Sequence, residues 1–391
     1  MIARPQADID DLLIVGGGPI GATLALALRD SGLSCRLFDA RESSAQGAGD
    51  RTLALAHNAR LTLERVGVWE RVADATAIHT IDISQKGGFG ITQLTAREAG
   101  VPALGYVIRY SALQAALDSA LADAGIAVDF GCKVEDIRTT PAQAVLSVRR
   151  SGTDTPEHYA ARLVAVADGS GEALRDIHRR KIDYRQCALT GLLRCEAMQP
   201  GVAFERFTSD GPVALLPFEP GYALVWTATP SRAAVLLAMD DNEFLAALYR
   251  HFGARVGHFT SIGPRQSFPL SLQFASQVTG QRSVVLGNAA QALHPIAGQG
   301  FNLGLRDVWS LAQLLLDSRA DEIGTARQLD SYASTRGVDR WTGVSVTHGL
   351  VRAFSSDHPL LRATRGLGLT IIDSIPPLKR ALARTMLNGL R

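Results

Sequence analysis

The 391-residue chain has 46% hydrophobic and 20% charged residues, a balance typical of a globular protein with two or three structural units. A net charge of +2 does not favour nucleic-acid binding by bulk electrostatics, and four scattered cysteines without a CxxC pair argue against disulfides and against a metal site. The N-terminus is too polar for a signal peptide, and no apolar run reaches membrane-spanning length. We therefore expect a cytoplasmic protein.

A glycine-rich turn near the N-terminus carries the first functional signal. A strand predicted over residues 12–15 leads into the pattern G-x-G-x-x-G of Gly16, Gly18 and Gly21, and an apolar helix predicted over residues 22–28 follows. In such a turn the first glycine makes the bend, the second lets a pyrophosphate approach the backbone, and the third packs helix on strand. We expect a bound dinucleotide; the alternative is a glycine-rich turn without a ligand.

Two side chains after this turn are candidates for contact with the same dinucleotide. A second strand, predicted over residues 35–38, ends in Asp39, where a carboxylate can accept hydrogen bonds from ribose hydroxyls. An acid at this position disfavours a 2′-phosphate, so FAD or NAD is expected rather than NADP. Arg51 precedes a helix predicted over residues 53–65 and can pair with a pyrophosphate, unless it is an ordinary solvated arginine.

The middle of the chain supplies a further acidic candidate. Two strands joined by glycines are predicted within residues 81–95, and Arg109 precedes a helix predicted over residues 111–122. A buried strand from residue 163 ends in Asp168, and an aspartate at a strand carboxyl end faces the ligand crevice of a doubly wound sheet. The alternative is a plain turn aspartate. Other strands are predicted at residues 128–130, 134–137, 144–149 and 159–163.

Residues 186–239 change to short strands separated by Gly, Pro and acidic turns, which indicates an antiparallel sheet inserted into the first domain. An amphipathic helix is predicted over residues 242–252, and the chain returns to the first domain through residues 268–273. Four apolar residues of the strands form either a wall for a substrate or an ordinary core: Ala214, Leu216, Leu224 and Trp226. The strands are predicted at residues 188–196, 202–209, 212–218, 222–229 and 233–239.

A second glycine-rich turn follows a short buried strand predicted over residues 284–286. Gly298, Gly300 and Gly304 allow backbone to approach a flat ligand, and Asn302 is predicted to cap the helix that starts there. Two such turns at opposite ends of one chain need one explanation. We expect a single FAD, with its ADP half on the first turn and its isoalloxazine ring on the second.

These motifs carry a family resemblance. The GGGPIG turn, the Asp168-Gly169 pair and the stretch GNAAQALHPIAGQGFNLG, in that order, resemble the flavin-dependent aromatic hydroxylases of the p-hydroxybenzoate hydroxylase fold. Within them the chain looks like the ubiquinone-biosynthesis hydroxylases of the 2-polyprenyl-6-methoxyphenol hydroxylase (UbiH) type, from about Asp11 to the C-terminus. The implied fold is α/β: a Rossmann-like FAD-binding domain with an inserted antiparallel-sheet substrate domain (an α+β insertion) and a C-terminal helical segment.

The domain boundaries expected on this basis divide the chain into six segments. The FAD-binding domain comprises residues 1–80, 104–180 and 268–340, the substrate domain comprises a strand pair at 81–103 and the sheet at 181–267, and C-terminal helices occupy 341–391.

The resemblance also implies residue roles. The residues expected to bind the ADP half and the ribityl-pyrophosphate region are Gly16, Gly18, Ile20, Gly21, Asp39, Arg51, Arg109 and Val134, the last through its backbone to adenine. Those expected near the flavin ring and ribityl chain are Asp168, Asn288, Gly300, Phe301 and Asn302, with Pro295 close to the substrate. Asp168 is also a candidate for contact with a nicotinamide nucleotide.

Three positions depart from the general family pattern. The general family has Gly-Asp, followed three residues later by His, at the start of the late motif. This chain has Gly287-Asn288 and Gln291 there, and the same residues are found in the UbiH type. Glu172 stands where the Asp-Gly motif usually has a serine, which puts the detailed role of Asp168 in doubt.

The implied chemistry belongs to the cofactor. NAD(P)H reduces FAD, O₂ forms a C4a-hydroperoxyflavin, and an electron-rich phenol attacks it. No second glycine fingerprint exists for a nicotinamide domain, so NAD(P)H is expected to bind transiently. His294, in the turn between flavin and substrate, is predicted to help deprotonate the phenol; the alternative is a turn histidine that bonds backbone.

The C-terminal segment is predicted to be helical. Its apolar stripe consists of Leu378, Leu382, Met386 and Leu390, and basic residues lie off the stripe: Lys379, Arg380 and Arg384. This helix either binds a membrane surface or a protein of a ubiquinone-biosynthesis complex, or packs on its own domain. A peripheral position at the inner membrane is therefore open.

The predicted function is FAD-dependent hydroxylation of a polyprenylated phenol in ubiquinone biosynthesis, with NAD(P)H and O₂. Two alternatives stay open: a hydroxylase of a small soluble phenol, and a flavin-binding scaffold subunit of a biosynthetic complex with little activity alone. A flavin halogenase is disfavoured because the four tryptophans are isolated and form no W-x-W-x-x-I-P signature.

Overall fold

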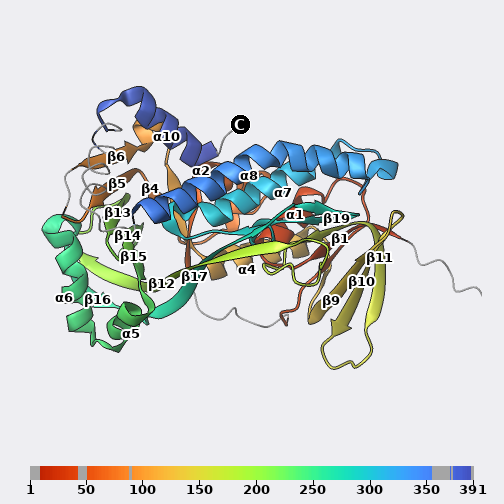
Figure 1. Cartoon of the computed structure of the whole chain (residues 1–391), viewed down its shortest axis with the longest axis horizontal. Coiled ribbons are helices and arrows are strands. Elements are labelled where there is room, and N and C mark those ends of the chain that lie inside the picture. The colour runs from red at the N-terminus through yellow and green to blue at the C-terminus, as the bar shows by residue number, and fades with distance from the viewer. Residues whose placement is uncertain (1–8, 43–50, 88–89, 355–369, 371–372, 389–391) are drawn as a thin grey trace, which may run out of the picture.

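Two large sheets and one small sheet organise the computed structural model, which describes residues 9–42, 51–87, 90–354, 370 and 373–388 (Figure 1). The first sheet lies at one end of the molecule and the second at the other (Figure 1). A long pair of strands and the helix α8 (Ala326–Phe354) run between them.

The first sheet is largely parallel and carries the N-terminal glycine-rich turn. Its strands are β1 (Asp10–Val15), β2 (Cys35–Phe38), β8 (Val128–Asp129), β11 (Glu157–Val166), β18 (Thr279–Gly280) and β19 (Ser283–Val285). The order is β18-β19-β11-β1-β2-β8, and β1 pairs in parallel with β11 and β2. Leu12, Leu13 and Ile14 are fully buried, as expected for a central parallel strand. An antiparallel extension consists of β9 (Cys132–Thr139) and β10 (Ala144–Arg150).

Three helices pack around this sheet and build the cofactor end of the molecule. They are α1 (Pro19–Ala27), α4 (Tyr110–Asp123) and α7 (Gln299–Leu316). Helix α1 contacts both α4 and α7, although α7 begins about 270 residues after α1 ends. This contact brings the second glycine-rich turn beside the first.

The second sheet is mostly antiparallel. Its strands are β5 (Thr80–Gln85), β6 (Ile91–Thr95), β12 (Arg179–Glu196), β13 (Val202–Thr208), β14 (Gly211–Phe218), β15 (Gly221–Ala228), β16 (His258–Ile262), β17 (Gln266–Ala275) and β20 (Gln291–Ala292). The order is β20-β17-β12-β15-β14-β13-β5-β6, with β16 also on β12. One face is covered by α5 (Pro230–Ala238) and α6 (Asp241–Phe252), where Trp226 packs against Phe244.

The remaining elements connect these layers. A small sheet has the order β3-β7-β4. Its strands and the short helices are β3 (Thr52–Ala56), β4 (Thr76–Ile78), β7 (Gly105–Arg109), α2 (His57–Arg65), α3 (Ala96–Ala99), α10 (Pro376–Asn388), and the 3₁₀ turns η1 (Trp69–Arg71), η2 (Gly253–Val256), η3 (Gly287–Ala289), η4 (Ile296–Gly298) and η5 (Ala320–Glu322).

Several sequence-based element predictions are wrong in detail. Residues 53–56 are strand β3, because they pair with β7, and the helix starts only at His57. Residues 233–239 are not a strand: Thr229 caps a helix there, Pro230 occupies its first turn, and Ala233 and Leu236 are buried at helical spacing. The two strands predicted around residue 163 are one strand, β11.

The predicted apolar substrate wall does not lie on one face. Leu224 and Trp226 point toward α5 and α6, whereas Leu216 packs on the opposite face with Phe218 and Val107. Successive side chains of a strand point to opposite faces of the sheet. The sequence alone does not show which of the two faces each helix or neighbouring sheet covers.

The domain boundaries stay predictions, but two strand positions bear on them. The strand pair β5–β6 extends the second sheet, on the side assigned to the substrate domain. Strand β17, assigned to the FAD-binding domain from residue 268 onward, pairs along β12 as part of the second sheet.

Candidate functional site

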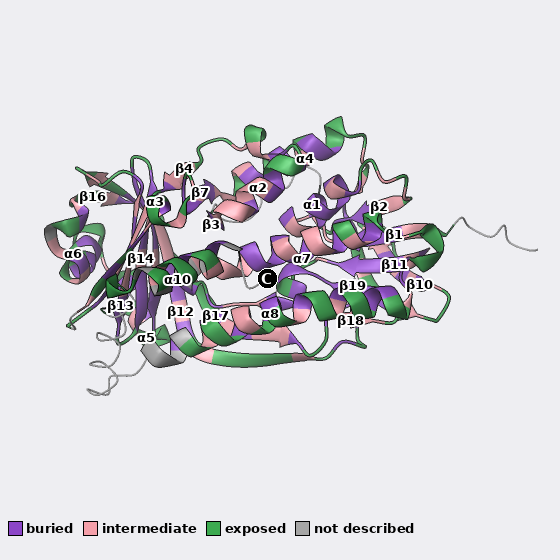
Figure 2. Cartoon of the chain, turned by 90° about the horizontal axis from the view of Figure 1, so that it is seen from above, coloured by how far each residue is buried: buried purple, intermediate pink, exposed green. Residues whose placement is uncertain are grey.

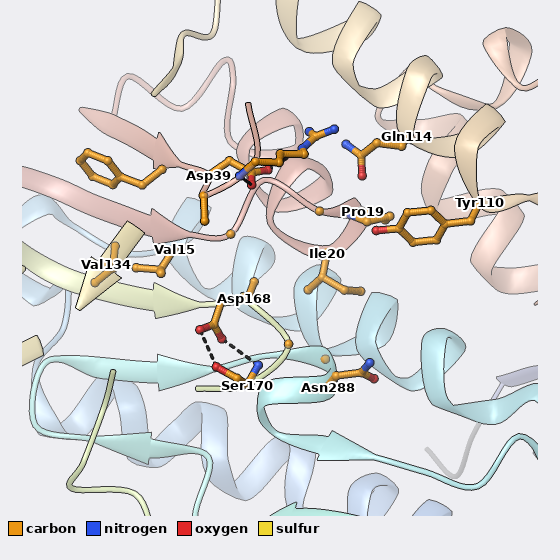
Figure 3. Close-up of a pocket in the computed structure, with 18 of the residues that line it drawn as sticks. Val15, Pro19, Ile20, Asp39, Tyr110, Gln114, Val134, Asp168, Ser170 and Asn288 are labelled. Carbon is orange, nitrogen blue, oxygen red and sulfur yellow. Dashed lines mark hydrogen bonds and ion pairs between the residues drawn. The ribbon is translucent and has the colours of Figure 1, made fainter. Parts of the chain in front are cut away.

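The two glycine-rich turns line one cavity of about 1370 Å³. The first turn contributes Gly16, Gly18 and Ile20, and the second contributes Asn288 and Gly300. Figure 3 shows Ile20 and Asn288 on the wall of this cavity. The carboxyl ends of β1 and β11 also open into it, at Val15 and Asp168. The cavity therefore lies at the edge of a parallel sheet where ligands of doubly wound folds bind.

Ile20 is the point at which the two turns touch. A Cβ atom added to Gly287 would lie 2.9 Å from Ile20 Cγ1, and one added to Gly304 would lie 2.8 Å from Ile20 Cδ1. Both distances are below van der Waals contact. The two glycines therefore let the second turn pack closely on α1 at Ile20.

The glycines of the first turn divide into two roles. A Cβ on Gly21 would lie 1.9 Å from the Gly16 carbonyl oxygen, so Gly21 serves the packing of α1 on β1. A Cβ on Gly18 would meet nothing nearer than the Tyr110 hydroxyl at 3.8 Å. Gly18 is the N-cap of α1 and makes no side-chain cap, so the open backbone at a helix start faces the cavity.

Asp39 lies at the end of β2 and lines the same cavity. Its side chain is 11% exposed and is held by Arg41, whose Nε donates to Oδ2 at 2.7 Å. Val134 of β9 lines the cavity on this side as well. Figure 3 shows both at the end opposite Asn288.

Arg51 and Asp168 also line the cavity, and their side chains make different contacts. The guanidinium of Arg51 lies 4.9 Å from the ring centre of Tyr110. The carboxylate of Asp168 accepts hydrogen bonds from the backbone N–H groups of Ser170 and Gly171 at 3.0 and 2.7 Å, and from the Ser170 hydroxyl at 2.9 Å (Figure 3). Asp168 thus shapes its own turn, whatever else it contacts.

Arg109 does not join this cavity. It ends β7 and its guanidinium lies 5.0 Å from the ring centre of Phe218 on β14. There it lines a separate cavity of about 510 Å³ together with His79 and Glu219. Its side chain points toward the second sheet, which the position of Arg109 in the sequence did not indicate.

Asn302 does not cap α7, contrary to the sequence prediction. The helix starts at Gln299 after Gly298. The Asn302 side chain is buried and accepts from the Ala56 N–H at 2.8 Å while its amide donates to the Gly298 carbonyl at 2.7 Å. It fastens β3 to the turn, and the neighbouring Gly300 and Phe301 line the cavity instead.

His294 is buried in the same turn, with 1% of its surface exposed. The Ile296 N–H donates to its Nδ1 at 3.2 Å, so the neutral ring carries its proton on Nε2. That Nε2 has no hydrogen-bond partner among the described residues. Burial lowers the pKa of His294 to about 4. Tyr184 packs edge-on to the ring with centroids 5.5 Å apart, and Pro295 is exposed beside it.

A buried polar network anchors this turn to α7 and α8. Gln291 donates to Asp307 at 2.6 Å and accepts from Arg340 Nε at 3.0 Å. Asp307 is paired with Arg336 at 2.8 Å, and all four residues are at most 6% exposed. The amide of Gln291 thus donates to a carboxylate and accepts from a guanidinium without adding a charge of its own. This explains how the chain accommodates glutamine at this position.

Sequence reasoning missed the cavity residues on α4, three of which carry larger polar side chains. Tyr110, Gln114 and Asp118 line the cavity and are spaced four residues apart, so they share one face of the helix. Their spacing was a usable signal, because polar side chains four residues apart share one face of an otherwise alanine- and leucine-rich helix. Arg41, which pairs with Asp118 at 2.8 Å, was missed as well.

The donor set suits FAD. Open backbone at Gly18 fits a pyrophosphate, the carboxylate of Asp39 fits ribose hydroxyls, and open backbone at Gly300 fits a ring edge, because a Cβ there would meet only Leu293 at 3.9 Å. The cavity connects these three features without a break.

The comparisons with known proteins agree with this reading. A family model described as an FAD binding domain matches residues 10–344. The ubiquinone hydroxylase UbiL of Rhodospirillum rubrum is 32% identical over 98% of this chain and 90% of its own length. The 3-demethoxyubiquinol 3-hydroxylase of Escherichia coli is 29% identical over 95% of this chain and 96% of its own. The p-nitrophenol 4-monooxygenase PnpA of Pseudomonas putida DLL-E4 shares the fold, with a TM-score of 0.78 at 16% identity over 98% of this chain and 99% of that chain. The predicted α/β fold class is confirmed.

Proposed function

Since the chain belongs to the FAD-dependent monooxygenase family that includes the ubiquinone hydroxylases, we propose that it hydroxylates a polyprenylated phenol intermediate of ubiquinone biosynthesis. Bound FAD supplies the redox chemistry with NAD(P)H and O₂. The observation that carries the proposal is the convergence of the two glycine-rich turns on one cavity through Ile20. The names of the relatives supply the substrate class.

The proposed contacts follow the two ends of the cavity. Gly18 and the start of α1 hold the pyrophosphate, Asp39 the ribose hydroxyls, and the Val134 backbone the adenine. Asn288 bonds the ribityl chain, and Gly300 with Phe301 flanks the ring. Gly16, Ile20 and Gly21 act by shaping the first turn, and Asn302 acts by fastening β3 to the second turn at Gly298.

The proposed role of His294 is narrower than that of a general base. Its low pKa keeps the ring neutral at physiological pH, and Nδ1 is already occupied by backbone. A neutral imidazole with its proton on Nε2 is a hydrogen-bond donor, suited to orient a phenol oxygen. Pro295 is the proposed substrate neighbour in the same turn.

We also propose peripheral association with a lipid surface, because a polyprenylated substrate resides in one. Among the described residues no helix combines the length and apolarity needed to cross a bilayer. Helix α8 leaves Val338, Trp341 and Val346 at least 49% exposed. Figure 2 shows exposed stretches of α8 in green.

The C-terminal helix α10 contributes less clearly to that surface. Leu387 is buried against Leu94 and Leu104, and Lys379 pairs with Glu98 at 3.1 Å. This part of the helix packs on its own chain. The side chains of Leu378, Leu382 and Met386, and Leu390 as a whole, lie outside the described residues.

The deciding experiment measures NAD(P)H oxidation, O₂ uptake and product mass with a short-chain 2-polyprenylphenol and with the matching phenol without the prenyl chain. We expect prenyl-dependent stimulation and a product heavier by one oxygen atom. Equal turnover of the unprenylated phenol would indicate a hydroxylase of small soluble phenols. Flavin binding without turnover of either compound would indicate a scaffold subunit.

Membrane association is tested separately by flotation with liposomes. Trp341→Ser and deletion of residues 378–391 are compared with the unchanged chain. Weaker flotation of either variant with retained FAD supports the proposal, and the pair assigns it to α8 or to the C-terminal helix. No flotation of the unchanged chain with anionic or neutral liposomes contradicts it.

A further inference from the structure

Arg41 lies directly behind the carboxylate proposed to bind the adenosine ribose. Its backbone N–H donates to Asp39 Oδ1 at 3.0 Å, and its Nε donates to Asp39 Oδ2 at 2.7 Å. Each carboxylate oxygen therefore has one fixed donor and keeps lone-pair capacity for another. The direction of the carboxylate is set before any ligand arrives.

Helix α4 in turn holds the guanidinium. Arg41 Nη1 and Nη2 donate to the two oxygens of Asp118 at 3.0 and 2.8 Å, in the bidentate geometry that makes such pairs strong. Nη2 also donates to the Gly17 carbonyl at 3.1 Å. Gln114 closes the cluster, because its amide donates to the same carbonyl at 3.1 Å and to Asp118 at 2.9 Å.

This arrangement links the glycine-rich turn, the end of β2 and α4 at one point of the cavity wall. Arg41, Asp39 and Asp118 all line the cavity. Helix α4 also pairs with a second arginine, outside the cavity. Arg71 of η1 contacts Asp123 and Ser119 of α4, and none of these three residues lines the cavity. The location of the Arg41 cluster, rather than the presence of an ion pair, suggests a function.

We propose that Arg41, held by Asp118, is a positioning residue that orients Asp39 for the adenosine ribose of FAD, and that the net negative charge of the cluster of Asp39, Arg41 and Asp118 makes the site reject a 2′-phosphate. Two carboxylates and one guanidinium leave the cluster with a net negative charge. A 2′-phosphate would be repelled, and the guanidinium that could bind it is already engaged. The proposal rests on the proposed placement of FAD in this cavity.

The test measures ligand affinity on the deflavinated full-length chain. FAD, FMN and ADP are titrated into the unchanged chain and into Arg41→Ala. We expect the Kd for FAD and for ADP to rise about tenfold, as for loss of a coupled charge contact, while the Kd for FMN stays unchanged because FMN lacks the adenosine. Arg41→Lys, which keeps the charge but not the bidentate pair, should fall between the two.

Asp118→Asn adds a readout that general loss of structure would not move. Because it removes one negative charge, it should narrow the preference for ADP over 2′,5′-ADP, whereas Arg41→Ala should widen it. In the double variant the effect on FAD affinity should be no larger than that of Arg41→Ala alone, since Asp118 acts through Arg41. Arg71→Ala is the matched control and should change neither affinity nor preference.

Three results separate the possible failures. If Arg41→Ala leaves the Kd for FAD within twofold of the unchanged chain, or raises the Kd values for FMN and FAD equally, the positioning role is wrong. If Asp118→Asn leaves the preference for ADP over 2′,5′-ADP unchanged, the charge argument is wrong. If Asp39→Ala also leaves FAD affinity unchanged, the proposed placement of the adenosine is wrong, independently of Arg41.

Discussion

Ile20 shows how much of the cofactor site depends on the size of single side chains. Its Cγ1 and Cδ1 atoms occupy the space that a methyl group on Gly287 or Gly304 would need. These glycines let the second turn approach the first, beside the polar groups proposed to bind FAD. At this scale, steric fit decides whether the site forms.

We expect Gly304→Ala to destabilise the protein by about 1–3 kcal/mol through overpacking and to weaken FAD retention. The added Cβ would lie 2.8 Å from Ile20 Cδ1 and 3.0 Å from the Gly287 Cα atom. Urea unfolding and FAD titration measure both effects. Ile20→Val in the same chain removes Cδ1 and should restore part of the loss. Gly337→Ala is the control, because a Cβ there meets nothing within 4 Å.

The burial of His294 makes the free energy of unfolding depend on pH. Burial lowers the pKa of His294 from 6.5 to about 4. Between these values the unfolded chain binds a proton that the folded chain does not, so stability is fully present above pH 6.5 and falls as pH drops toward 4.

We therefore expect His294→Gln to bind about one proton fewer on unfolding in this window, and to show a flatter pH dependence. Urea unfolding at several pH values from 7.5 to 4.5 measures the slope. An unchanged slope would mean that His294 titrates normally in the folded protein. The dependence of kcat/KM on pH should likewise be the same near pH 6.5 in the unchanged enzyme and in His294→Gln, because His294 does not ionise there in the folded protein.

At the scale of elements, α7 and α8 are joined by charges where a core would normally be apolar. Arg306 pairs with Asp339 at 2.9 Å, and Arg336 pairs with both Asp307 and Asp339 at 2.8 Å. Gln291 connects this network to the turn that follows β19. Helix α8 thus buries Arg336, Asp339 and Arg340 and leaves Val338 and Trp341 exposed.

We expect Asp307→Ala to lower the free energy of unfolding by about 3–5 kcal/mol, since Arg336 loses one of its two carboxylate partners while it stays buried. Thermal and urea unfolding measure the change. Asp321→Ala breaks an exposed pair with Arg319, whose side chains are 82% and 75% exposed, and should cost no more than about 1 kcal/mol. Equal effects of the two variants would contradict the argument.

The errors of the sequence predictions also belong to this scale. Residues 233–239 combine apolar residues that fit a strand as well as a helix over so short a length, and the cap at Thr229 with Pro230 was the better signal. Residues 53–56 were assigned to a helix because the pairing of β3 with β7 joins segments some 50 residues apart, which a local pattern does not reveal.

At the scale of the whole molecule, the cavity is built from segments that span most of the chain. Its lining begins at Val15 and ends at Phe301. A ligand that fills it must stabilise both ends of the chain together, because it binds the folded state alone.

We expect hydrogen exchange to show this coupling. Adding FAD to the deflavinated chain should slow exchange in peptides that cover residues 16–22 and 287–304 together, whereas FMN should protect the second segment more than the first. Peptides of β13 and β14, which do not line the cavity, are the internal control. Protection of only one segment by FAD would contradict a single cofactor on both turns.

The sequence by itself determined the glycine fingerprints, the acid at the end of β2 and the order of the motifs, and these led to the confirmed FAD-dependent hydroxylase family. Such features are local, because a tight turn or a close backbone approach restricts the residue at its own position. Only the tertiary structure decided that Ile20 joins the two turns, that Arg109 faces a different cavity, that Asn302 is buried, and that Arg41 is held by Asp118. Each of these depends on which distant elements pack together, and the side-chain directions that result are a property of the packed layers rather than of any one segment.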